Sequence, residues 1–547
     1  MRVALRYCAS LLFALAGPAI ITAAQPALKP NVLLICIDDL KPTIGCYGDA
    51  YAKTPHIDRL AARGIAFDSA YCNQAVCSPS RNSLMTGLRP QSLGIYDLAT
   101  HFRKAAPDAI TLPQHFRRHG YRAEALGKIL HVGHGNTDDA ASWDVPLFKP
   151  RKAPTYALPN EGEKRIDSRG NARGPVTEIA DVGDESYHDG AVASEAIRRL
   201  NSAAKQPTPF FLAVGFIRPH LPFVAPKRYW EMYDPKQVPM PSVTTAPQNA
   251  PGYAATSFGE LRTYAGVPED SPIDPELTRH LIHGYYAATS YADSQVGRLL
   301  DALDGSAVAD NTIVVLWGDH GWHLGDHGMW CKHTNYEQAA RIPLIIAAPG
   351  AAKGAHSEAM IETVDIYPTL SELAGLAPPD AVDGVSFAGV VNDPTATARQ
   401  SVIHVYPRGN RLGRAIRTPR YRMVQWKPIG GSDQEAEYEL YDYRSDPLET
   451  RNIATAKPDV LKDLQAVLAT HPAPKPQWKS VQAKQAAEKV KSDRGALFKK
   501  RDRNKDQLLT LDEFMLNQPD PENAGERFPK FDRNGDSVLS PAEFVGE

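Results

Sequence analysis

Cysteine is scarce in this chain, with six among 547 residues. Cys8 lies in the N-terminal apolar stretch, and the others show no metal-binding or redox spacing, which excludes a disulfide-rich scaffold. Apart from Cys77, four cysteines could pair in three ways or stay reduced and buried, because a chain of this length does not need disulfides. These four are Cys36, Cys46, Cys72 and Cys331.

An excess of charge of either sign is also missing. The sequence has 61 lysine and arginine residues against 63 aspartate and glutamate residues. Such a balance produces no global field that would attract a polyanion. We therefore expect no nucleic-acid partner.

Long hydrophobic runs are absent apart from one at the N-terminus. Leu11 to Ala23 is apolar, is broken by Gly17 and Pro18, and follows a basic start with Arg2 and Arg6. This pattern predicts a secretory signal peptide over residues 1–24, with an uncleaved anchor as the alternative. Because no second run follows, we expect no membrane span after signal removal and a periplasmic or extracellular protein.

The length and the changes in composition predict several units. We expect an α/β catalytic domain over residues 25–395 and an antiparallel subdomain over 396–470. A linker rich in Pro, Lys, Ala and Gln would span 471–492, followed by a helical module over 493–547. The continuous apolar strands of the first domain predict a large mixed, mostly parallel sheet sandwiched by helices.

Three of these apolar strands end in polar side chains. Asn31 to Ile37 is followed by Asp38 and Asp39, Phe210 to Phe216 leads to His220, and Thr312 to Trp317 leads to Asp319 and His320. The carboxyl ends of parallel strands share one edge of a sheet, where ligands bind. Adjacent buried carboxylates repel each other unless a cation is present, so we favour a metal site here over a solvated turn.

A reactive side chain lies at a predicted helix start. Ser78 is a candidate N-cap, and Pro79 suits the first helical position. Cys77 would then lie at the positive end of the helix dipole, which lowers the pKa of a thiol. Arg81, one turn further on, could support an oxyanion beside residue 77. An inert buried thiol is the alternative interpretation.

Two further candidates are defined by their spacing. Lys128 and His131 are three residues apart, so a helical turn would place both on one face.

The sequence Cys77-Ser78-Pro79-Ser80-Arg81, followed by Leu84, Thr86 and Gly87, resembles the signature of the formylglycine-dependent sulfatases in the alkaline-phosphatase-like superfamily. The resemblance covers about residues 31–452. It is closest to the iduronate 2-sulfatase-like branch, which shares the Pro219-His220-Leu221-Pro222-Phe223 pattern.

This resemblance implies an active site and its cofactors. Cys77 would be oxidised to formylglycine by a formylglycine-generating enzyme, and the substrate would be a sulfated carbohydrate. The implied catalytic residues are Cys77, Arg81, Lys128, His131, His220 and Lys332. The implied ligands of an active-site Ca²⁺ are Asp38, Asp39, residue 77, Asp319 and His320.

Two other functions stay open at this stage. A phosphomonoester or phosphonate hydrolase can use the same scaffold, and an unmodified Cys77 would suit a calcium-dependent glycan-binding protein. Tyr96, Asp97 and His101 are candidate sugar contacts.

The C-terminal module contains two calcium-loop candidates of the EF-hand type, with acidic surface loops as the alternative. Both loops lack the usual glycine at position six, where they have Gln507 and Ser537. Their predicted ligands are Asp502, Asn504, Asp506 and Glu513 in the first loop and Asp532, Asn534, Asp536 and Glu543 in the second.

Overall fold

The computed structural model describes residues 29–150, 154–158, 164–166, 172–270, 272–479, 493–515 and 527–545. The predicted signal peptide, residues 1–24, lies outside these residues, as does the second half of the predicted linker. Within the described residues, no helix combines the length and the apolar character that crossing a bilayer requires.

A seven-stranded mixed sheet forms the centre of the catalytic domain, in the order β14-β2-β13-β10-β1-β8-β4. The neighbours β10, β1, β8 and β4 are parallel to one another, and β13 runs against β10 and β2. The α/β prediction with a mostly parallel sheet is confirmed. The strands are β1 (Asn31–Ile37), β2 (Ile65–Phe67), β4 (Arg122–Gly127), β8 (Phe210–Phe216), β10 (Thr312–Gly318), β13 (Leu344–Ala347) and β14 (Ala355–Ser357).

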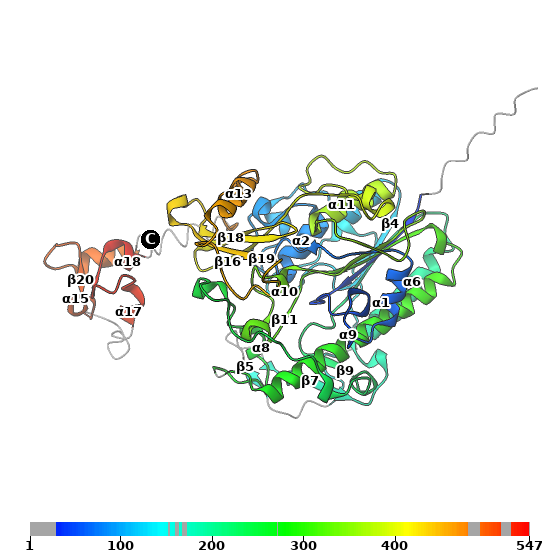
Figure 1. Cartoon of the computed structure of the whole chain (residues 1–547), viewed down its shortest axis with the longest axis horizontal. Helices are drawn as coiled ribbons and strands as arrows, with labels where there is room; N and C mark the ends of the chain where they lie inside the picture. Colours follow the sequence, from blue (N-terminus) through cyan, green and yellow to red (C-terminus); the bar gives the residue numbers. More distant parts are fainter. Residues whose placement is uncertain are drawn as a thin grey trace, which may run out of the picture.

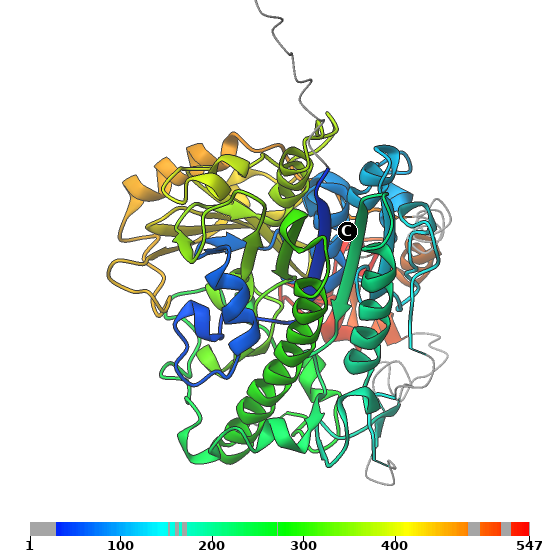
Figure 2. The same cartoon turned by 90° about the vertical axis from the view of Figure 1, so that its right-hand side faces the viewer.

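Helices cover both faces of this sheet (Figures 1 and 2). One face packs against α2 (Cys77–Thr86), α5 (Leu112–Arg118) and α11 (Ile366–Leu373). The other packs against α1 (Pro55–Ala62), α6 (His188–Ala203) and α9 (Pro275–Asp304). A hydrophobic core lies between each face of the sheet and its helices. Successive side chains of β1 pack alternately into these two cores, with Val32 and Leu34 on the α2 side and Leu33 and Ile35 on the α9 side. This two-sided burial explains the continuous apolar sequence of β1.

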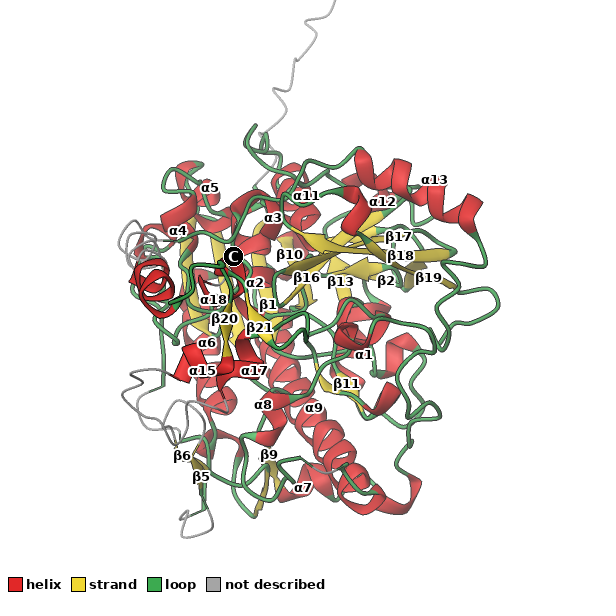
Figure 3. Cartoon of the chain, turned by 90° about the vertical axis from the view of Figure 1, so that its left-hand side faces the viewer, coloured by secondary structure: helices red, strands yellow, loops and turns green. Residues whose placement is uncertain are grey.

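A second sheet follows the catalytic domain (Figure 3). It is antiparallel, in the order β16 (Val402–Arg408), β17 (Arg411–Arg417), β18 (Tyr421–Pro428) and β19 (Glu437–Asp442), and α13 (Pro458–Ala469) packs on it. In β17, Arg411, Arg414 and Arg417 recur every third residue, which hides the alternation that is typical of a strand.

The first half of the predicted linker, residues 471–479, packs on the catalytic domain. Tyr96 donates its hydroxyl to the Lys475 carbonyl at 2.7 Å, and Asp97 accepts from Gln477 at 2.8 Å. The ring of His101 accepts from the Arg103 amide at the start of a short helix. The polar groups predicted as sugar contacts thus hold neighbouring parts of the chain.

The described cysteines are all reduced. Cys36, Cys72 and Cys331 are buried, and Cys46 is half-buried. Of the two alternatives from the sequence, the structure has the reduced one.

The C-terminal module has a small core of its own, built from Phe498, Phe514, Phe528 and Phe544. Its two loops are joined by the antiparallel pair β20 (Leu509–Thr510) and β21 (Val538–Leu539), visible in Figure 3. The elements around them are α15 (Leu511–Met515), α17 (Phe528–Phe531) and α18 (Pro541–Val545).

Candidate active site

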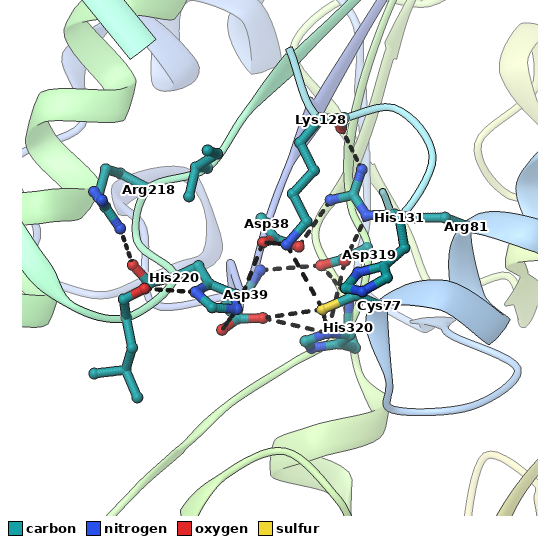
Figure 4. A network of polar contacts seen from close by, with 12 residues as sticks. Asp38, Asp39, Cys77, Arg81, Lys128, His131, Arg218, His220, Asp319 and His320 are labelled. Atoms are coloured by element: carbon teal, nitrogen blue, oxygen red, sulfur yellow. Dashed lines mark hydrogen bonds and ion pairs between the residues drawn. The ribbon is translucent and has the colours of Figure 1, made fainter. Parts of the chain in front are cut away.

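Four polar residues meet where β1 and β10 end. The strands pair in register from Asn31 with Thr312 to Ile37 with Gly318, so Asp38 and Asp39 follow one strand where Asp319 and His320 follow its neighbour. The amide of Asp39 donates to Asp319 Oδ1 at 3.0 Å. All four side chains are completely buried. The structure therefore brings the predicted metal ligands of both strands to a single edge of the sheet (Figure 4).

Helix α2 brings Cys77 to the same place. Its Sγ lies 3.4 Å from His320 Nε2, 4.0 Å from Asp39 Oδ1 and 3.9 Å from Lys128 Nζ. The helix begins two residues earlier than predicted, with Val76 at the N-cap, so Ser78 is not the cap. Burial and the nearby Asp38 carboxylate raise the pKa of the Cys77 thiol, against the lowering expected from the helix dipole. As a plain thiol, Cys77 is a poor nucleophile here.

Arg81 links the two strand ends. Its guanidinium is completely buried and donates to Asp38 at 2.9 Å and to Asp319 at 3.0 Å. The remaining nitrogen donates to the backbone carbonyls of Lys128 and Ile129. Arg81 therefore organises the carboxylates, and its direct support of an oxyanion stays a prediction.

Lys128 and His131 lie in the loop after β4, which turns at Gly127 with a φ of 70°. The expected helical turn is wrong, but both residues still reach the site. Lys128 forms an ion pair with Asp38. His131 Nε2 lies 3.0 Å from His134 Nδ1, and burial together with Lys128 lowers the pKa of His131 to about 3. The neutral imidazole is therefore the form present at neutral pH, which suits a proton acceptor.

His220 and Lys332 both lie beside Asp39. Lys332 Nζ is 3.1 Å from Asp39 Oδ1, and His220 Nε2 is 3.9 Å from Asp39 Oδ2. Burial alone would lower the pKa of His220, but the Asp39 and Asp38 carboxylates raise it to about 10. Both groups are cationic at neutral pH and can serve as proton donors.

Glu260 is the residue of this site that sequence reasoning missed. It lies on α8 (Gly259–Arg262), a single turn inside a proline-rich stretch, and no spacing connects it to the other residues. Its carboxylate is 2.9 Å from Lys332 Nζ and 3.2 Å from His220 Nε2. Burial would raise the pKa of Glu260, but Lys332 and His220 hold it well below its usual range.

The donor set at the strand ends fits a hard divalent cation. Ligand atoms of Asp38, Asp39, Cys77 and His320 all lie within 4.8 Å of one another. Asp319 adds a carboxylate oxygen 3.6 Å from His320 Nε2. The other ring nitrogen of His320 lies 3.0 Å from the Gly321 carbonyl, which orients Nε2 toward the cluster. Asp39 adopts a φ of 59°, the kind of backbone conformation that is often found at functional sites.

Comparisons with known proteins agree with this geometry. Residues 30–376 match the family model described as Sulfatase, and residues 325–471 match that of the N-sulphoglucosamine sulphohydrolase C-terminal region. Iduronate 2-sulfatase of Mus musculus is 31% identical over 77% of this chain and 90% of its own length. A sulfatase of Formosa agariphila is 32% identical over 78% of this chain and 83% of its own length.

Solved structures show the same fold. A phosphonate monoester hydrolase from Silicibacter pomeroyi has a TM-score of 0.65 at 24% identity, covering 81% of this chain and 95% of its own. A protein solved with its substrate D-glucosamine-2-N,6-O-disulfate has a TM-score of 0.64 at 22% identity, covering 81% of this chain and 97% of its own. On the family match and the 30% or higher identities, the chain belongs to the sulfatase family, whose members hydrolyse sulfate esters.

Proposed function

We propose that this sulfatase cleaves sulfate esters of sulfated uronic acids or related polysaccharide sugars, using residue 77 after oxidation of Cys77 to formylglycine. The observation that carries the proposal is the position of Cys77, within 4.0 Å of Asp39, Lys128 and His320 at one sheet edge. The raised pKa of its thiol argues against direct attack by sulfur. A hydrated aldehyde supplies one hydroxyl to attack the ester sulfur and a second whose deprotonation lets sulfate leave.

The residues around position 77 provide the proton transfers. Asp39 lies close enough to residue 77 to accept the proton of the attacking hydroxyl. His220 or Lys332, both cationic, can protonate the leaving sugar oxygen. Neutral His131 can take the proton of the second hydroxyl when sulfate departs. Lys128 stabilises the negative charge that develops on the sulfate oxygens.

The metal that we propose for this site is Ca²⁺. Asp38, Asp39 and Asp319 supply hard oxygen ligands, which suit calcium, and the residue 77 hydroxyl would add another. His320 is the one nitrogen donor of the set. A bound divalent cation lowers the pKa of a coordinated hydroxyl and stabilises charge on the sulfate.

The substrate proposal rests on the relatives. Two of them, from Mus musculus and Homo sapiens, are iduronate 2-sulfatases, and another is a Delta 4,5-hexuronate-2-O-sulfatase of Bacteroides thetaiotaomicron. These names indicate a sulfated uronic acid as the first substrate to test.

Side-by-side rates test the reaction class. Protein coexpressed with a formylglycine-generating enzyme is assayed on an aryl sulfate and on the matched aryl phosphate and phosphonate monoester. We expect the sulfate to be cleaved with the highest kcat/KM. Faster cleavage of either phosphorus ester would favour the phosphoryl-transfer alternative, for which the phosphonate hydrolase fold gives a precedent.

A glycan-binding function without catalysis is tested by mass spectrometry of the peptide that contains residue 77. We expect the aldehyde. An unmodified thiol under every expression condition, together with calcium-dependent glycan binding, would favour the alternative.

We also propose that the C-terminal loops bind Ca²⁺ as an EF-hand pair with a stabilising role. Gln507 and Ser537, at position six of each loop, adopt φ values of 65° and 67°, the conformation that glycine usually supplies there. One carboxylate oxygen of Asp502 is buried and has no hydrogen-bond partner among the described residues. Calcium titration of the full chain, with Glu513→Gln and Glu543→Gln as variants, is expected to show weaker binding in both; unchanged binding would contradict the proposal.

Export is proposed from the N-terminal sequence alone. Residues 1–24 would direct the chain to the periplasm or the medium and be removed. N-terminal sequencing of the secreted protein should begin at Gln25, and an intact N-terminus retained in the membrane fraction would contradict this.

A further inference from the structure

A cavity of about 350 Å³ opens beside the reacting centre. It shares Lys128, His131 and His220 with that centre and continues past His220 to Arg218 and Tyr264. Figure 4 shows Arg218 beyond His220 as seen from Cys77. A substrate whose sulfate reaches residue 77 therefore has space for the rest of its sugar in this direction.

The wall of this cavity is cationic. Beyond the residues that it shares with the reacting centre, its lining includes Lys149, Arg173 and Arg218, and among the described residues no aspartate or glutamate lines it. Arg173 lies over the Tyr264 ring at 5.5 Å. An anionic group would gain more from such a wall than a neutral hydroxyl, because hydrogen bonds between two charged groups are stronger.

Arg218 is the strongest indication of an anionic ligand. It is only 5% exposed, and within the described part of the chain it has no carboxylate partner; its guanidinium donates to the His220 carbonyl. Asp189, which is close to the Arg218 backbone, accepts from the amides of Ile217 and Arg218 and contacts His188. A buried cation without a counter-charge is costly unless a ligand supplies one.

Two completely buried arginines of this chain have carboxylate partners, whereas the buried Arg414, like Arg218, is bonded to backbone carbonyls. Arg81 pairs with Asp38 and Asp319, and the equally buried Arg422 pairs with Glu337 and Glu449. Arg218 differs from Arg81 and Arg422 in this respect, and it lines a cavity through which an anionic ligand could reach it.

We propose that Arg218, with Lys149 at the rim, forms a subsite for a second anionic group of the substrate, either a carboxylate or a second sulfate on the same sugar as the reacting ester. The subsite makes Arg218 a specificity residue, since its planar donors match an oxyanion in two-point contact. The inference rests on the proposed sulfatase reaction at residue 77, and it narrows the substrate to sugars that carry two anionic groups.

A series of three substrates tests this subsite. Each is a 2-O-sulfated methyl glycoside. They differ only in the C6 group attached to C5, which is a carboxylate, a hydroxymethyl group or a sulfated hydroxymethyl group. We expect the wild type to prefer one or both dianionic substrates over the hydroxymethyl compound by roughly 10- to 100-fold in kcat/KM. Preference for the carboxylate or for the second sulfate identifies which group the subsite takes, and equal kcat/KM for all three overturns the proposal.

Variants separate recognition from structure. Arg218→Met should lower kcat/KM for the preferred dianionic substrate at least tenfold more than for the hydroxymethyl compound, and Arg218→Lys should keep part of the preference, since it keeps the charge. Lys149→Gln, at an exposed rim position, is the variant that tests the subsite if Arg218→Met does not fold. It should raise KM for the dianionic substrate alone, by about threefold. Equal losses on all substrates in every variant would mean that Arg218 only orders the His220 loop, and would overturn the proposal.

A binding measurement makes this result independent of turnover. Titration calorimetry of the unsulfated hexuronate methyl glycoside into Cys77→Ala protein should show binding that Arg218→Met abolishes. If no sulfate ester is cleaved but this binding persists, the reaction assigned to residue 77 is wrong and the subsite stands. If sulfate esters are cleaved and neither the hexuronate nor a C6 sulfate depends on Arg218, the subsite is wrong and the reaction stands.

Discussion

Glu260 gives the sharpest prediction about the anion site. Its carboxylate occupies the donors of Lys332 and His220, at 2.9 and 3.2 Å, which a sulfate group also needs. The substitution Glu260→Gln keeps the size of the side chain but removes its charge and replaces one of its two acceptor oxygens by an amide donor. A bound sulfate would then displace a weaker competitor.

The size of the effect follows from these two contacts. A hydrogen bond with a charged partner contributes about 1.5–3 kcal/mol, against about 0.5–1.5 kcal/mol for a neutral one, so two such bonds differ by about 2 kcal/mol. Because the Glu260 side chain is 24% exposed, solvent screening reduces this difference to about 1 kcal/mol. That corresponds to about fivefold tighter binding of the anion.

The assay is inhibition of aryl sulfate cleavage by inorganic sulfate at constant ionic strength. The inhibition constant should fall about fivefold in Glu260→Gln. Glu269→Gln is the matched control, because Glu269 lies in the same proline-rich stretch, is 71% exposed and pairs with Arg165 away from the site. An unchanged or higher inhibition constant in Glu260→Gln would refute the competition argument and show that Glu260 instead orders the two cations.

Three further predictions follow from the same structure. Cys77→Ser has one hydroxyl and no second one to expel sulfate, so it should gain one SO₃ group by mass spectrometry without turnover; cleavage at the parent rate would disprove this. After EGTA treatment, Asp319→Asn should need about 10- to 100-fold more calcium than the wild type to recover half of its activity. An identical calcium titration would show that Asp319 is not a metal ligand. Burial would raise the pKa of Glu337, but Arg417 and Arg422 lower it from 4.5 to about 2. This lowered pKa contributes about 3 kcal/mol of stability above pH 4.5 that is lost as the pH falls toward 2. Glu337→Gln should therefore lower Tm at neutral pH and make Tm fall less steeply between pH 4.5 and pH 2. A Tm lowered by the same amount at every pH would contradict the role assigned to the Glu337 charge.

The strands that carry the active site were predictable because burial on both faces leaves an uninterrupted apolar sequence. Strands β1 and β8 begin and end where the sequence indicated, at Asn31–Ile37 and Phe210–Phe216. The opposite direction of β13 was not predictable, because an apolar run is the same in either direction. Pairing between distant strands, not local sequence, determines it.

The site itself was only partly visible in the sequence. Residues at strand ends, such as Asp38 and Asp319, could be placed because parallel strands share an edge. Lys128 was placed through its resemblance to a known pattern, and the local geometry expected for it was wrong because Gly127 turns the chain at a positive φ. Glu260 could not be found, since only the folding of a long proline-rich stretch brings it against Lys332.

The most direct test of the central claim is the relation between aldehyde content and sulfate release. Preparations made with graded amounts of formylglycine-generating enzyme would be analysed by mass spectrometry at residue 77 and assayed for inorganic sulfate released from a sulfated hexuronate. The proposed chemistry predicts a rate proportional to the aldehyde fraction, with none from the unmodified thiol. A rate independent of that fraction would contradict it.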